Sequence, residues 1–225
     1  MPTISIANPK GGTGKSTTAL ILATTLAAKG TTVHAIDCDP NHALGDWAGH
    51  SKNPLTVSVS RGQDHILDEI DESVAKNAFT VIDLEGTASS LVTKSLAVSD
   101  FVIVPMQGSF LDSRQGARAV KIALDAERMS RRRIPVRVLM TRTSAAIQSR
   151  HQTAIMQQLR AGAIEIFETT LTERAAFRHL FPSRLSLDEM SPDEIGGLDK
   201  ARANATAFAK EVFDWIMEKT ANVAA

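Results

Sequence analysis

The sequence predicts an α/β fold: a single domain built on a doubly wound, mostly parallel β-sheet flanked by helices. Three observations lead to this prediction. Short apolar runs rich in Val and Ile alternate with helix-like stretches along most of the 225 residues. These runs lack the polar alternation of half-exposed strands, which is typical of strands buried on both faces. A glycine-rich loop separates the first apolar run from the first helical pattern.

The strand-like runs are Thr3–Ala7, Thr32–Ile36, Leu55–Val59, Phe79–Leu84, Phe101–Pro105, Val136–Met140 and Ile164–Phe167. The helix-like stretches are Ser16–Lys29, Asp64–Lys76, Ser89–Ser99, Ser113–Arg131 and Gln148–Ala161, with a polar loop over Pro182–Gly197 and a last helix over Asp199–Lys219. Such alternation implies right-handed crossovers between parallel strands. We expect one domain spanning residues 1–225. In sheets of this kind, ligands bind beyond the carboxyl ends of the strands.

Composition narrows the class of protein. No apolar run approaches the ~20 residues of a membrane span, and the chain runs into its first strand without a signal-peptide pattern. The single cysteine, Cys38, permits no internal disulfide and fits a reducing cytosol. The six histidines are scattered, with none at metal-ligand spacing, so we expect no zinc site. A cytoplasmic protein without a membrane anchor is the expectation.

The net charge of zero hides an uneven distribution. Residues 1–100 hold 7 basic and 11 acidic residues, and residues 161–225 hold the same numbers. Residues 101–160 hold 11 basic and 3 acidic residues, an excess of eight positive charges. A basic middle in an otherwise acidic chain is a candidate surface for a polyanion.

The stretch Asn8–Thr18, N-P-K-G-G-T-G-K-S-T-T, predicts a phosphate-binding loop. Its glycines let successive backbone N–H groups point at phosphate oxygens, and the helix that follows adds its partial positive charge. Lys15 is placed to reach the β- and γ-phosphates, and the Ser16 hydroxyl is placed to ligate Mg²⁺. Strand, glycine-rich loop and helix occur in the order that such a cradle requires.

Acidic residues end two of the predicted strands. Asp37 and Asp39 follow the second strand, and two carboxylates at this spacing can both face a bound nucleotide. One can hold a water of the Mg²⁺ shell while the other orients the attacking water. Asp83 follows the apolar run Thr80–Ile82 in the manner of a Walker B acid, which binds Mg²⁺ directly or through water. The alternative interpretation of the acids after the second strand is that they only cap a turn at Asp39-Pro40.

The phosphate loop departs from the usual pattern because Pro9 stands where the first glycine is expected and Lys10 follows it. This second lysine is the mark of the deviant Walker A group, so the chain resembles the ParA/MinD family of ATPases. The resemblance implies that ATP is bound by Lys10, Gly11, Gly12, Thr13, Gly14, Lys15, Ser16 and Thr17. It further implies that Lys10 reaches across a dimer interface to the partner's nucleotide.

The resemblance extends to the acidic residues. Asp37-Cys38-Asp39-Pro40-Asn41 is similar to the family's D-x-D-P-Q, which implies that Asp39 positions the water and Asp37 supports the metal. The implied catalytic residues are Lys10, Lys15 and Asp39, and the implied metal ligands are Ser16, Asp37 and Asp83. Where the family continues with D-T-P-P or D-T-P-A, this chain has Asp83-Leu84-Glu85-Gly86-Thr87.

Two aromatic or basic residues have alternative interpretations. Arg142 ends the sixth strand where related proteins read the base, so it either stacks on adenine or is a solvated arginine. The stretch Thr170–Arg174 resembles the family's loop beside the adenine pocket. Trp47 lies either near the dimer face or in the core, of which the core is the simpler expectation.

The helix after the fifth strand ends in three consecutive arginines, Arg131, Arg132 and Arg133. Family dimers bind DNA non-specifically through surface arginines and lysines, which implies phosphate contacts and a steep dependence on salt. The alternative is a solvated, dipole-compensating helix end. No helix-turn-helix pattern precedes the phosphate loop, so sequence-specific operator binding is not expected.

The resemblance implies an ATP-dependent homodimer that binds Mg²⁺ and non-specific DNA, is nucleoid-associated, and is reset when a ParB-like or cargo-adaptor protein stimulates hydrolysis. The first hypothesis is partition or positioning of plasmid, chromosomal or other cargo. The second is a conjugation- or virulence-associated relative that recruits a DNA-transfer complex to the cell pole. The third is a metabolic enzyme of the nitrogenase-iron-protein or dethiobiotin-synthetase type. Acids in the last helix argue against a membrane-binding helix like that of MinD relatives.

Overall fold

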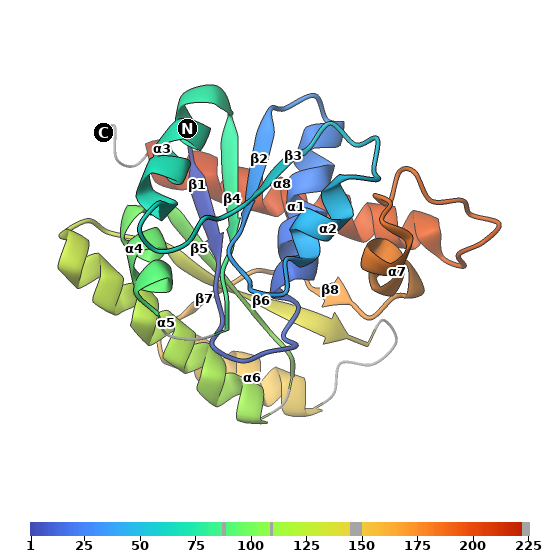
Figure 1. The fold of residues 1–225 in the computed structure, drawn as a ribbon. Coiled ribbons are helices and arrows are strands. Elements are labelled where there is room, and N and C mark those ends of the chain that lie inside the picture. The colour runs from blue at the N-terminus through green and yellow to red at the C-terminus, as the bar shows by residue number, and fades with distance from the viewer. Residues whose placement is uncertain (87–88, 109, 145–149, 222–225) are drawn as a thin grey trace.

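The computed structural model describes residues 1–86, 89–108, 110–144 and 150–221; the side chains of residues 110–116, 119 and 150–152 lie outside the description. In this part of the chain an eight-stranded sheet is flanked by helices on both faces (Figure 1). Seven strands run in the order β3-β2-β4-β1-β5-β6-β7, and β8 pairs with the far part of β6. Every pairing is parallel. The predicted doubly wound fold is therefore confirmed.

The strands are β1 (Thr3–Ile6), β2 (Val33–Asp37), β3 (Thr56–Val59), β4 (Phe79–Asp83), β5 (Phe101–Met106), β6 (Val136–Thr143), β7 (Glu165–Ile166) and β8 (Leu171–Thr172). The helices are α1 (Lys15–Ala28), α2 (Ala43–Ala48), α3 (Ile66–Lys76), α4 (Ser90–Val98), α5 (Phe110–Ser130), α6 (Arg150–Ala161), α7 (Ala175–Ser183) and α8 (Leu198–Ala221). The first two positions of the expected helix Gln148–Ala161 lie outside the described residues.

Two hydrophobic clusters form the core, one on each face of the sheet. Helices α1, α2, α7 and α8 pack on one face, and α3, α4, α5 and α6 pack on the other (Figure 1). Successive strand residues alternate between the clusters: Val81 belongs to the first and Ile82 to the second. Burial on both faces explains why the strands read as unbroken apolar runs.

Three short elements were not expected from the pattern. Helix α2 has six residues, β8 has two, and α7 ends just beyond Pro182, where the polar loop was predicted to begin. Segments this short show little periodicity, so tertiary packing decides their conformation. Trp47 of α2 is 1% exposed, which supports the core interpretation of this residue.

No helix among the described residues has the length and apolar character needed to cross a membrane.

Candidate functional site

The glycine-rich loop between β1 and α1 lies at the carboxyl edge of the sheet, at the lower end of the molecule in Figure 1. Neighbouring strands hold it in place. Asn8 donates from Nδ2 to the Pro105 carbonyl (2.8 Å) and accepts the Lys10 backbone N–H on Oδ1 (2.9 Å). Thr141 donates from Oγ1 to the Thr13 carbonyl (2.8 Å), with the Met106 carbonyl at 3.2 Å as a second acceptor.

A further contact comes from Gln107, whose Nε2 donates to the Gly12 carbonyl (2.8 Å). Gly12 and Gly14 have φ angles of 74° and 93°, a left-handed backbone that favours glycine. Side chains at the ends of β1, β5 and β6 thus hold one N–H group and two carbonyls of the loop, which favours an ordered loop without a ligand. Such preorganisation suits a phosphate cradle whose N–H groups must face an anion.

Lys15 and Asp83 lie together beneath the loop. Lys15 is 6% exposed, and the Asp83 carboxylate at the end of β4 is fully buried. The pKa of Asp83 is raised to about 7, chiefly by burial and also by the Asp37 and Asp39 carboxylates, while the Ser16 hydroxyl and the Lys15 ammonium oppose the shift. Apart from the Ser16 hydroxyl, which lies close enough to lower this pKa, neither oxygen of Asp83 has a hydrogen-bond partner among the described residues.

This unpartnered carboxylate fits a magnesium site. Mg²⁺ takes oxygen ligands and is usually held by one or two protein groups together with substrate phosphates. Ser16 is the second residue of α1, and its hydroxyl lies close enough to Asp83 to lower the pKa of that carboxyl group. A hydroxyl and a carboxylate therefore lie together beside the phosphate loop. A buried carboxylate without a partner is costly unless a cation or proton compensates it.

Asp37 and Asp39 occupy different surroundings. Asp37 is fully buried at the end of β2, and its two oxygens accept the backbone N–H groups of Asp39 (3.1 Å), Leu44 (2.9 Å) and Gly45 (3.0 Å). Asp39 is half-buried and accepts the Asn41 N–H on Oδ1 (2.9 Å). The structure thus places both acids near Asp83, but Asp37 is already engaged by the backbone.

The segment after Asp83 contacts the phosphate loop directly. A Cβ atom on Gly86 would lie 3.3 Å from the Pro9 carbonyl oxygen and 3.4 Å from the Lys15 Nζ. Gly86 therefore stands where the chain passes close to the loop, in the segment that departs from the D-T-P-P pattern. Thr87 lies outside the described residues.

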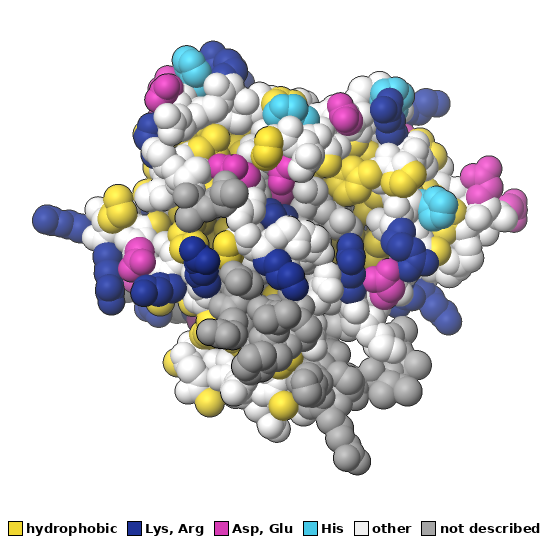
Figure 2. All heavy atoms as spheres, turned by 60° about the horizontal axis from the view of Figure 1, so that its bottom comes forward, with side chains coloured by type: hydrophobic (Ala, Val, Ile, Leu, Met, Phe, Trp, Pro, Cys, Tyr) yellow, Lys and Arg dark blue, Asp and Glu magenta, His cyan; other side chains and the backbone are white. Residues whose placement is uncertain are grey.

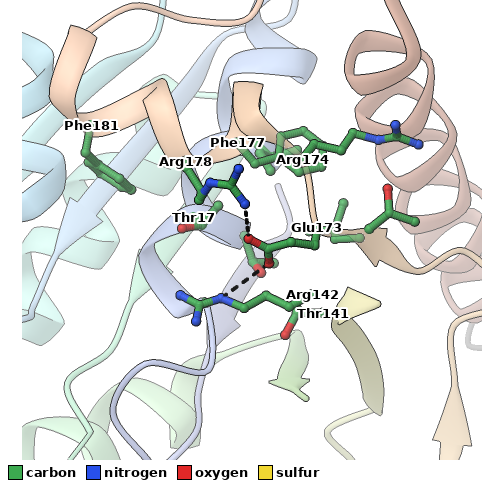
Figure 3. A pocket seen from close by; sticks show the side chains of 13 residues that line it. Thr17, Thr141, Arg142, Glu173, Arg174, Phe177, Arg178 and Phe181 are labelled. Atoms are coloured by element: carbon green, nitrogen blue, oxygen red, sulfur yellow. Dashed lines mark hydrogen bonds and ion pairs between the residues drawn. The ribbon is translucent and has the colours of Figure 1, made fainter. Parts of the chain in front are cut away.

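A pocket of about 270 Å³ opens beside α1 (Figure 3). Its lining comes from α1, β6, β8 and α7 and includes Gly14, Thr17, Thr141, Arg142, Phe177 and Phe181. Figure 3 shows Arg142 and Arg178 both reaching toward Glu173, which pairs with Arg178 at 2.6 Å and with Arg142 at 3.9 Å. The pocket adjoins the phosphate loop at Gly14 and Thr17, where the base of a bound nucleotide is expected.

The three arginines after α5 lie at the opposite edge of the sheet. Arg132 donates to the Asp100 carboxylate (2.6 Å) and to the Ser99 carbonyl (2.5 Å), just before β5 begins. Arg131 and Arg133 are exposed. Arg132 thus has a structural partner, whereas its two neighbours face solvent. Since β5 spans six residues at about 3.3 Å each, roughly 20 Å separates this cluster from the carboxyl edge.

Figure 2 shows the face toward the carboxyl edge, where Lys and Arg side chains form a band. Exposed basic residues in the described part of the chain include Arg118 and Lys121 of α5, Arg142 of β6 and Arg178 of α7. The basic middle of the sequence is therefore spread over the surface of α5 and the end of β6, rather than confined to the three arginines.

Sequence reasoning missed the residues that hold the loop. Asn8 was included in the predicted loop without a role of its own, Thr141 was assigned no role, and Gly86 was noted only as part of a departure from the family pattern. Their contacts join positions more than 70 residues apart, which no local pattern encodes. The one available signal for Thr141 was its place near the carboxyl end of β6, the strand beside β5, because ligands bind at that edge of the sheet.

Comparison with known proteins agrees with this geometry. Residues 4–181 match the family described as CobQ/CobB/MinD/ParA nucleotide binding domain. A protein ParA of Rhizobium radiobacter is 36% identical over 220 residues, covering 97% of this chain and 99% of the relative. Maintenance of carboxysome distribution protein A of Halothiobacillus neapolitanus is 21% identical over 192 residues, 84% of this chain and 87% of that protein.

Solved structures share the fold. A Cyanothece McdA variant in complex with ATP superposes with a TM-score of 0.76 at 17% identity, covering 94% of this chain and 96% of that one. A putative plasmid partition protein of Borrelia burgdorferi bound to AMPPNP superposes with a TM-score of 0.70 at 19% identity, covering 97% of this chain and 99% of that one.

The fold and the site define a P-loop nucleotide-binding protein. The chain belongs to the CobQ/CobB/MinD/ParA nucleotide binding domain family, and its relatives place it with the ParA-like partition and positioning ATPases. The family expected from the Lys10 signature is confirmed.

Proposed function

We propose that this protein is an ATP-dependent, dimerising ATPase that partitions or positions plasmid, chromosomal or other cargo on nucleoid DNA. The observation that carries the proposal is the ordered loop holding buried Lys15 beside the unpartnered carboxylate of Asp83. A cation and a metal-ready acid side by side beneath a glycine-rich loop suit a triphosphate with Mg²⁺. The identity of 36% along nearly the whole of a ParA protein supports the biological role.

The proposed chemistry is attack of water on the γ-phosphate of ATP. The backbone N–H groups from Gly11 to Thr17 hold the phosphates, and Lys15 offsets their charge. Ser16 and Asp83 would hold Mg²⁺, which neutralises charge on the phosphate oxygens when bound. Asp39 aligns the attacking water, and Arg142 lies against the adenine.

Lys10 is assigned to the partner's nucleotide in a homodimer. It is half-buried, and its backbone N–H donates to the Asn8 side chain. The dimer would retain DNA through phosphate contacts of exposed arginines and lysines, and a ParB-like or cargo-adaptor protein would stimulate hydrolysis and release it. DNA retention of this kind makes the protein nucleoid-associated.

A conjugation- or virulence-associated role at the cell pole is the second candidate. It shares the same site and the same dimer, so the nature of the cargo distinguishes the two. Relaxase and transfer proteins as binding partners would favour the second candidate, and a centromere-binding protein would favour the first.

The test is light scattering of wild type and Asp39→Ala with and without Mg-ATP, followed by addition of DNA. We expect Asp39→Ala to form a stable dimer only with ATP and to retain DNA in that state, because hydrolysis no longer resets it. Lys10→Ala should bind ATP with unchanged affinity yet lose partner-stimulated hydrolysis. A monomeric Asp39→Ala with bound ATP, or normal stimulated hydrolysis by Lys10→Ala, would contradict the proposal.

A further inference from the structure

Two buried carboxylates stand side by side with opposite surroundings. Asp37 and Asp83 are register partners at the ends of β2 and β4, and both are fully buried. Three backbone N–H groups donate to the Asp37 carboxylate, whereas none of the described backbone N–H groups donates to the Asp83 carboxylate. A carboxylate that accepts several amides is stabilised as an anion without a metal ion. The two acids therefore have different tasks.

The amides that Asp37 accepts come from both ends of one segment. Oδ1 takes the N–H of Asp39 (3.1 Å), and Oδ2 takes the N–H groups of Leu44 (2.9 Å) and Gly45 (3.0 Å) in the first turn of α2. The first N–H groups of a helix have no partner within the helix, so a side chain from outside must satisfy them. A single carboxylate thus fixes where the segment from Asp39 to Gly45 begins and ends.

Asp39 lies inside this segment and is held by it. Its carbonyl accepts the His42 N–H (2.9 Å), and its Oδ1 accepts the backbone N–H (2.9 Å) and the side-chain Nδ2 (2.8 Å) of Asn41. These contacts form a tight turn, which is attached to Asp37 through the backbone N–H of Asp39. The position of the Asp39 carboxylate therefore depends on the Asp37 anchor.

The other side of α2 is anchored in the core. Leu44 and Trp47 are buried, and Trp47 Nε1 donates to the Leu185 carbonyl (3.3 Å). A Cβ atom on Gly45 would lie only 2.5 Å from Val59 Cγ2 on β3. A side chain at position 45 would therefore press on Val59 and oppose the close approach of α2 to β3.

We propose that Asp37 is a positioning residue for hydrolysis, which holds α2 and the turn carrying Asp39, and that Ser16 and Asp83 hold Mg²⁺ without it. This inference rests on the proposed function, in which Asp39 aligns the attacking water. It revises the sequence-based assignment of Asp37 to the metal. Loosening the anchor lowers kcat, because the water is misaligned, and leaves nucleotide binding and the demand for Mg²⁺ nearly unchanged.

The test compares Gly45→Ala, Val59→Ala and the double variant. Gly45→Ala should displace α2 through the contact with Val59 and removes no carboxylate from the site. We expect kcat to fall at least fivefold, with the KM for ATP and the Mg²⁺ concentration for half-maximal rate within twofold of wild type. Val59→Ala alone should behave as wild type. In the double variant the removed Val59 methyl groups leave room for the side chain introduced at position 45, so kcat should return to within twofold of the wild-type value.

The fluorescence of Trp47, which lies in α2, reports the position of this helix independently of ATP hydrolysis. In a Trp215→Phe background, Gly45→Ala should shift the Trp47 emission and the double variant should return it. A shifted emission with unchanged kcat overturns the inference, and so does a loss of kcat that Val59→Ala fails to rescue. If wild type itself hydrolyses no ATP, the proposed function fails, whereas the emission result still shows whether α2 moved.

Asp37→Asn distinguishes the anchor from a metal ligand. An asparagine amide cannot accept all three backbone N–H groups, so kcat should fall at least tenfold, and excess Mg²⁺ should not restore it. Recovery of kcat toward the wild-type value at high Mg²⁺ would show that the lost group bound the metal and would overturn the proposal.

Discussion

At the scale of single residues, Asp83 has the most unusual environment of the described acids. Burial raises its pKa to about 7, far above the usual range of an aspartate. The Ser16 hydroxyl and the Lys15 ammonium lower this pKa only in part, so the buried charge stays unfavourable. The residue therefore links pH to stability.

Without metal, Asp83→Asn should stabilise the protein, and more so at high pH. An acid whose pKa is raised on folding holds its proton in the folded state, so wild type loses stability as pH rises from about 4 to about 7. We expect the advantage of the variant to grow by about 2–3 kcal/mol between pH 5 and pH 8. Chemical denaturation of both proteins in EDTA at pH 5 and pH 8 measures this difference in the free energy of unfolding.

The matched control is Asp68→Asn on the exposed side of α3. Its difference from wild type should stay nearly constant over the same pH range. A constant difference for Asp83→Asn as well would mean that the folded protein tolerates this carboxylate in its charged form without cost.

At the scale of elements, the ends of neighbouring strands shape the phosphate loop. The hydroxyl of Thr141, on β6, ties the loop to the sheet through the Thr13 carbonyl. Thr141→Val removes this donor and leaves a buried carbonyl unsatisfied, which costs about 1–2 kcal/mol. ATP affinity measured by calorimetry should therefore fall roughly tenfold.

Thr143→Val is the control for that experiment. Thr143 lies two residues further on the same strand, and its hydroxyl pairs with Thr170 (2.9 Å) rather than with the loop. ATP affinity should change less than twofold. Equal losses in the two variants would indicate a general effect of β6 on the fold instead of a specific hold on the loop.

The arginines after α5 divide by their contacts. Arg131→Ala with Arg133→Ala should weaken DNA retention and reduce the slope of log K against log salt by about 0.9 for each lost phosphate contact. Arg132→Ala should instead lower the free energy of unfolding by about 1 kcal/mol, because it removes a donor from the partly buried Ser99 carbonyl. Filter binding over a salt series and denaturation separate the two effects. Unchanged DNA retention at low salt would remove this surface from the proposal.

At the scale of the molecule, the two hydrophobic clusters share one sheet, so we expect a single cooperative unit. Trp215 of α8 packs edge-to-face against Phe101 (4.9 Å between centroids) and Phe167 (5.3 Å), and Arg137 lies over its ring. Trp215→Ala should cost about 3–5 kcal/mol and move one calorimetric transition to lower temperature.

Met217→Ala, on the exposed side of the same helix, should leave the transition nearly in place. Two separable transitions in either variant would contradict the expectation of a single domain over residues 1–225.

The sequence by itself determined the strands, the longer helices and the phosphate loop, because those features depend on local periodicity and on the spacing of glycines and lysines. The family followed from Lys10 and Lys15, and Asp83 followed from its place after an apolar run. Each of these signals lies within a few consecutive residues.

Only the tertiary structure decided how those parts act on one another. It gave Asp37 three backbone N–H groups and Asp83 none, although both acids end similar strands. It joined Thr141 to the loop and placed α2 and α7 beside the site. The physical reason is that the environment of a buried group depends on atoms brought close by the fold, which the local order of residues does not specify.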